Sequence, residues 1–165
     1  MTTDREKLVA KRLKLQLKNK AKERISSAAY ILEKLDEQRV SYEFMMDLNT
    51  AEDDKEVVDW PFLNFPDTGW GQIDWDKVVS KSVCKEPDID AKKAFIDKSF
   101  KLEAHEKVYV SWANAFSPTI SIDYNDCLKM LFEILEEDFD CWIYSIEHKL
   151  IVESYHEGDL TFGKV

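Results

Sequence analysis

The residues best suited to acid–base or metal chemistry lie near the C-terminus, in the segment 153–159 (ESYHEGD). A histidine beside carboxylates can act as a general base or as a metal ligand. A regular strand, however, would place Glu153 and His156 on opposite faces, because successive side chains alternate. We therefore interpret the segment as a polar strand end followed by a hairpin turn. His105 and His148 lie in charged, turn-like segments and are interpreted as surface residues.

Other features of the sequence argue against catalysis and against a bound cofactor. With four glycines in the chain, neither a GxGxxG motif nor a P-loop is present, and the GxSxG and HExxH motifs are also missing. Cys84, Cys127 and Cys141 form no CxxC pair, so we expect free thiols and no bound metal. The sequence favours a protein that is not an enzyme, with a small enzyme using His156 and its neighbouring carboxylates as an alternative.

Acidic and aromatic residues gather in the segment 52–76, where five acidic residues lead into a run with three of the five tryptophans. Aromatic residues are enriched at the centres of protein interfaces, and loops carry function more often than regular elements do. We predict that this segment binds a partner, with Trp70 or Trp75 as an anchor. The alternative is that its tryptophans pin a long loop to the core. The predicted partner-binding residues are Asp53, Asp54, Glu56, Trp70, Asp74, Trp75 and Asp76.

A second acidic group ends a predicted helix over residues 124–139. Carboxylates near the negative end of the helix dipole cost roughly 0.3–1 kcal/mol each at the surface, and no lysine lies in the last turn to relieve them. A charge pattern that opposes helix stability suggests that these residues meet a basic partner. Glu136, Glu137 and Asp138 are therefore added to the predicted partner-binding residues.

The net charge of −10 is unevenly spread along the 165 residues. Residues 1–24 hold nine Lys and Arg against three Asp and Glu, a net +6, whereas residues 25–165 hold 14 against 30, a net −16. An acidic body repels phosphate backbones and attracts basic proteins. We expect a basic protein partner and no direct contact with nucleic acid, and we interpret Lys7–Arg24 as the solvated face of a helix.

Hydropathy indicates where the protein acts. No run of 18 apolar residues is present, so we expect no membrane span. The charged segment Met1–Arg24 lacks the apolar core of a secretory signal. We therefore expect a cytoplasmic protein. The sequence does not indicate an oligomeric state.

The first part of the chain is predicted to be mainly helical. Thr3 and Glu6 have the spacing of a capping box, and an apolar residue recurs every three or four positions up to Leu35. This pattern predicts one helix over residues 4–37, whose Lys-rich first half projects from the body or packs on a partner. Residues 40–46 alternate like a strand, with a helix as the alternative. Further helices are expected at 51–59, ended by Trp60-Pro61, at 75–83 and at 89–100.

The last part of the chain is predicted to form an antiparallel sheet with one packed helix, in the order β-β-α-β-β-β. The helix 124–139 presents Leu128, Leu131 and Leu135 to the sheet. Short links between strands favour antiparallel pairing. The fold class is therefore α+β, with a helical region 1–104 and an α+β region 105–165 in one compact unit. The expected strands are 107–114, 119–122, 141–146, 150–155 and 160–165.

Three stretches carry a resemblance to a known family: residues 110–118 (VSWANAFSP), 139–145 (FDCWIYS) and 150–163 (LIVESYHEGDLTFG). They resemble the C-terminal part of small bacterial immunity proteins from contact-dependent growth inhibition and other polymorphic-toxin systems. The resemblance covers about residues 105–165. It implies a protein that binds a cognate toxin domain, often a nuclease, in the cytosol and blocks its active site or substrate groove.

The resemblance assigns no catalytic residue, and the charge of the chain agrees with it. Nuclease toxins bind phosphate and so tend to be basic, and an acidic inhibitor gains association rate by electrostatic steering. Other basic partners would fit the same charge. A non-catalytic interaction or adaptor module that uses the N-terminal helix is the alternative function.

Overall fold

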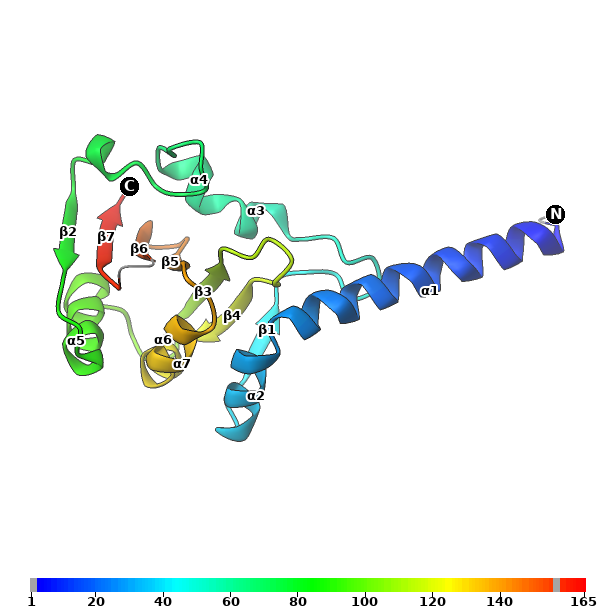
Figure 1. The fold of residues 1–165 in the computed structure, drawn as a ribbon, viewed down its shortest axis with the longest axis horizontal. Coiled ribbons are helices and arrows are strands. Elements are labelled where there is room, and N and C mark those ends of the chain that lie inside the picture. Colours follow the sequence, from blue (N-terminus) through cyan, green and yellow to red (C-terminus); the bar gives the residue numbers. More distant parts are fainter. Residues whose placement is uncertain (1–2, 156–157) are drawn as a thin grey trace.

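The strands in the described part of the chain form one seven-stranded antiparallel sheet (Figure 1). The structure is a computed structural model and describes residues 3–155 and 158–165. The strand order is β1-β4-β3-β5-β6-β7-β2. The five strands predicted in the last third of the chain are confirmed, each within two residues of its expected ends. The bounds are β1 Tyr42–Phe44, β2 Lys81–Cys84, β3 Lys107–Trp112, β4 Ile120–Asp123, β5 Cys141–Ser145, β6 Leu150–Ser154 and β7 Leu160–Lys164.

Both edge strands come from the first half of the chain. β1 pairs with β4 and confirms the strand interpretation of residues 40–46. β2 pairs with β7, where a helix over residues 75–83 was predicted, and that prediction was wrong. Only Trp75–Lys77 forms a short 3-10 helix, η1. Pairing with the open edge of β7 satisfies backbone groups that a short isolated helix would leave exposed, so tertiary structure overrides the local pattern.

The N-terminal helical segment begins where predicted, but it is broken. The capping box is confirmed, because Thr3 N donates to Glu6 at 2.7 Å and Glu6 N donates to Thr3 Oγ1 at 3.2 Å. At Ala28 the backbone leaves the helical conformation (φ −108°, ψ 25°), and this break separates α1 (Asp4–Ser27) from α2 (Ala29–Glu37). The break turns α2 onto the sheet, where its apolar side chains are buried.

The remaining helices are short, apart from α5 (Ile89–Phe100), which has the predicted bounds and an Asp88 cap. Pro61 does not end a helix as expected. It lies in the first turn of α4, where its missing N–H leaves no hydrogen bond unmade. The predicted helix 124–139 is divided at Met130 and ends at Glu136, three residues earlier than expected. The bounds are α3 Lys55–Val58, α4 Trp60–Asn64, α6 Tyr124–Lys129 and α7 Leu131–Glu136.

The sheet is buried on both faces. The helices α2, α5, α6 and α7 cover one face, and Leu131 of α7 is fully buried there. The other face carries α3, α4 and the tryptophan-rich loop, which pack on Trp142 and Tyr144 of β5. Because β5 lies between the two layers, all five of its residues are buried. The second layer holds the acidic and aromatic segment against the sheet.

Over most of its length α1 projects away from the body, as Figure 1 shows for the blue helix. Of its residues, only Ala21 and Arg24 are buried. This confirms that the Lys-rich first half can project from the body. Within the described ranges, no helix has both the length and the apolar character needed to cross a bilayer.

Candidate functional site

A groove of about 420 Å³ lies on the side of the sheet covered by α3 and α4. One wall comes from α4 and the loop after it, with Phe62 and Trp70. The other wall is the loop 113–119 between β3 and β4, and Trp142 of β5 also lines the groove. An open groove with aromatic walls is a surface suited to a protuberance of another protein.

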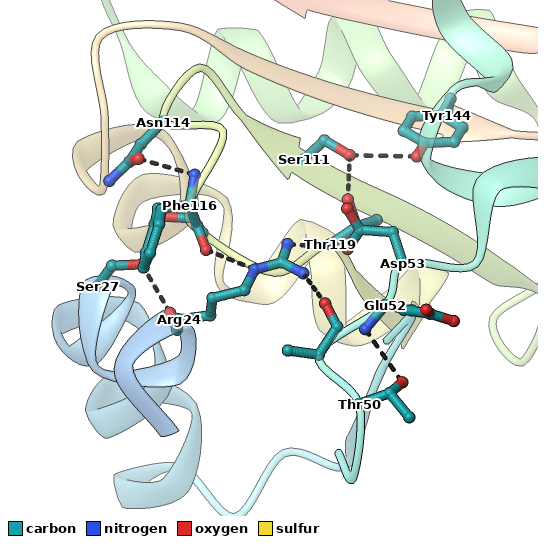
Figure 2. A network of polar contacts seen from close by, with 12 residues as sticks. Arg24, Ser27, Thr50, Glu52, Asp53, Ser111, Asn114, Phe116, Thr119 and Tyr144 are labelled. Atoms are coloured by element: carbon teal, nitrogen blue, oxygen red, sulfur yellow. Dashed lines mark hydrogen bonds and ion pairs between the residues drawn. The ribbon is translucent and has the colours of Figure 1, made fainter. Parts of the chain in front are cut away.

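Arg24 fastens the base of the groove (Figure 2). Its side chain is buried, and its Nη2 forms an ion pair with Asp53 Oδ1 at 2.8 Å. Its Nη1 donates to Ala51 O at 2.9 Å, and its Nε donates to Phe116 O at 3.0 Å. A guanidinium with its donors in a fixed fork can hold several acceptors at once. Arg24 thereby ties the segment 51–53 and the loop 113–119 to α1.

An acidic depression adjoins the groove. Asp53 and Asp59 line both hollows, so the two form one continuous surface. Because carboxylates of one sign in a hollow concentrate the field, this surface attracts cations and basic proteins. The depression is lined by Glu52, Asp53, Asp54, Lys55, Glu56 and Asp59.

Tyr144 holds α3, which follows the acidic segment 52–54, in place. Its hydroxyl donates to Val57 O at 2.9 Å, and its ring stacks on Trp60 with centroids 5.6 Å apart. Burial raises the pKa of Tyr144, so its phenol stays protonated and remains a donor. Ser111 joins this network at 3.1 Å, as Figure 2 shows. The acidic depression is therefore built on a packed aromatic support.

Trp70 is 88 % exposed, at the tip of a turn beside the groove. Gly69 and Gly71 on either side have φ values of 81° and 78°, which favour glycine. Asp67 Oδ1 accepts from Gly69 N at 2.7 Å, and Asp67 bridges to Ile73 across the turn. The turn thus holds a large aromatic side chain out in water, which is expensive unless a partner covers it.

Trp75 has a different environment, because Glu153 binds it. Glu153 is 3 % exposed and accepts from Trp75 Nε1 at 2.8 Å and from Trp142 Nε1 at 2.7 Å. It also accepts from Ile73 N at 3.0 Å. Glu153 lies near the end of β6, before the link to the antiparallel β7, as expected, but its side chain is buried and not at a polar surface. Its carboxylate is occupied by three N–H groups, and its former candidate partner His156 lies outside the described residues.

The second acidic group is partly engaged within the chain. Glu137 Oε2 accepts from Ile31 N in the first turn of α2 at 3.0 Å, and burial raises the pKa of Glu137. Asp138 Oδ2 accepts from Asn114 N, at the rim of the groove, at 2.8 Å. Hydrogen bonds from these two N–H groups stabilise the carboxylates of Glu137 and Asp138, which the negative end of the α7 dipole destabilises. Glu136 is exposed.

The structure thus divides the predicted partner-binding residues. It brings four of them together, since Asp53, Asp54, Glu56 and Trp70 line the joined groove and depression. Asp74 forms an ion pair with Lys77 at 2.9 Å, and Asp76 lies exposed on η1. Neither of these two lines the groove or the depression.

Two kinds of reactive groups lie elsewhere. Among the described residues, Glu106, Glu147 and His148 form the group that could hold a metal, with ligand atoms within 4.8 Å of one another. Sequence reasoning missed this group, because only the turn between β5 and β6 brings His148 beside Glu106. The three cysteines are free and buried, and burial raises the pKa of Cys127 to about 12. A thiol with such a pKa is a poor nucleophile.

Comparison with known families defines the class of this protein as an immunity protein of contact-dependent growth inhibition. The chain belongs to the CdiI immunity protein family: residues 35–163 match the family model described as "CdiI immunity protein EcoliA0-like". The match confirms the resemblance seen in the last third of the sequence and extends it across both edge strands. A search of curated proteins gave no match. The match does not include α1.

Proposed function

We propose that this immunity protein neutralises a basic toxin domain by binding it across the groove and the acidic depression. The observation that carries the proposal is the meeting of an exposed tryptophan with a continuous acidic surface. Trp70 supplies the anchor, because a tryptophan removed from water contributes a large apolar area at a low entropy cost. Asp54 and Glu56, exposed beside it, steer the toxin into place.

The toxin class that best fits this surface is a nuclease. A nuclease domain presents cationic side chains where the phosphate backbone of its nucleic-acid substrate binds. A row of carboxylates on α3 and the segment before it offers those cations an alternative anion. An inhibitor bound there blocks the substrate groove, and the toxin is neutralised in the cytosol, where its nucleic-acid substrate lies.

We further propose that inhibition needs no catalysis by the immunity protein. The support comes from the groups that could have reacted. The Glu153 carboxylate is held by three donors, and the Cys127 and Cys141 thiols are buried with raised pKa values. Stoichiometric rather than substoichiometric neutralisation is the expected behaviour.

Neutralising the exposed acidic side chains tests the steering step. The double variant Asp54→Asn/Glu56→Gln is expected to lower the association rate with the cognate toxin domain by about 10-fold at low salt. The effect should shrink as salt screens the charges. Stopped-flow association measured at several salt concentrations gives both values.

The matched control is Glu86→Gln/Asp90→Asn, which removes the same charge from exposed positions near the start of α5. This control should change the association rate far less. Equal effects of the two double variants would show that only net charge matters, and would overturn the assignment of the acidic depression.

A further inference from the structure

The projecting half of α1 carries an apolar stripe that continues the buried face of the helix. Val9, Leu13 and Leu17 recur every four residues and form a stripe that turns by about 40° per step around α1 toward the buried Ala21. Along α1 this stripe leaves the body, and Leu13 is 55 % exposed. The stripe is about 12 Å long at 1.5 Å per residue. Val9 and Leu13 are exposed, and Leu17 is partly buried.

The positive charge of α1 indicates that a partner covering this stripe has an acidic surface. Residues 1–24 carry a net +6, and the lysines of α1 flank the stripe. If the toxin is basic, which rests on the proposed function, the toxin is a poor partner for α1. The family match covers residues 35–163 and does not include α1. The helix therefore needs an acidic surface of its own.

The body of a second copy offers such a surface. Residues 25–165 carry a net −16, and Phe132 and Glu136 lie one turn apart on α7. Phe132 is about half exposed, and Phe139, just past the helix end, is 80 % exposed. Phe132 and Glu136 on α7, and Phe139 three residues past its end, place two exposed phenyl rings beside an exposed carboxylate on this part of the body.

We propose that two copies of this chain associate by exchanging α1. The stripe Val9–Leu17 of each copy packs on the Phe132–Phe139 face of the other, and its flanking lysines meet the acidic body. The helix points away from its own body in Figure 1, so the contact forms between chains. The reciprocal contact closes a two-fold dimer, the commonest symmetry of soluble oligomers.

Sedimentation equilibrium of the full chain, without toxin, tests the exchange. The wild-type chain is expected to form dimers of twice 19.3 kDa, and more weakly at high salt. Leu13→Asp should raise the dimer dissociation constant by about 10-fold or more, because it places a charge in the covered stripe. Leu15→Asp is the matched control, since Leu15 is similarly exposed but lies on the lysine-rich side of α1.

The acceptor side has its own pair of variants. Phe139→Ser should weaken the dimer as Leu13→Asp does, whereas Val79→Ser, at a fully exposed position, should leave it unchanged. A wild-type chain that stays monomeric, equal effects of the two leucine variants, or a dimer unaffected by Phe139→Ser would each overturn the proposal. Binding of anionic vesicles or nucleic acid by a monomeric chain would also overturn it. Because no toxin is present, these outcomes are independent of the toxin-binding proposal.

Discussion

Replacing Glu153 with alanine is expected to lower the free energy of unfolding by roughly 3–5 kcal/mol. The substitution leaves three buried N–H groups without an acceptor, two of them on the indoles of Trp75 and Trp142. Each donor left unsatisfied in the interior costs about 1–3 kcal/mol. The change also releases the loop that carries Trp70. Urea unfolding followed by tryptophan fluorescence measures the loss.

The control for this substitution is Glu43→Ala, which removes an exposed glutamate from the edge strand β1. A surface change of this kind usually stays within about 0.5 kcal/mol. If Glu153→Ala were no more harmful than Glu43→Ala, the carboxylate would not be the support of the tryptophan-rich loop.

Leu131→Ala is expected to destabilise the protein by about 2–5 kcal/mol. Leu131 begins α7 and is fully buried against the sheet among the helices of the larger core cluster. Truncation removes buried methyl groups and leaves a cavity that the surrounding helices fill only in part. Thermal or urea unfolding gives the value directly.

The same substitution at Leu63 is the comparison, because that side chain is largely exposed on α4. Its loss should cost far less than the loss at Leu131. A small effect at Leu131, similar to that at Leu63, would show that α7 does not pack on the sheet as described.

The strands and α5 could be predicted from sequence because their signals are local. Alternating β-branched and aromatic residues mark β3. Asp88 caps α5, because its side chain accepts a hydrogen bond from the N–H of Ala91, three residues later. The break at Ala28 and the pairing of β2 have no such local signal. Both depend on partners far along the chain, namely Glu137 for the start of α2 and β7 for β2.

The candidate site could be predicted in part for the same reason. The exposure of Trp70 follows from two neighbouring glycines that favour a tight turn. The partial burial of Trp75 depends on Glu153, 78 residues away, and that glutamate follows three apolar residues in β6. A single carboxylate after a run of apolar residues was the one feature of the sequence that could have indicated a buried hydrogen-bond acceptor at Glu153. Arg24 gave no signal, because it ends a run of exposed basic residues.

The central claim is that the groove beside Trp70 binds the toxin, and Trp70→Ala tests it most directly. Titration calorimetry with the cognate toxin domain should show affinity weaker by about 2 kcal/mol or more, which is roughly 30-fold. The melting temperature should not change, because the side chain is 88 % exposed. Val79→Ala, at a fully exposed apolar position outside the groove, should bind as the wild type does. A folded Trp70→Ala variant with wild-type affinity would contradict the claim and place the toxin interface elsewhere.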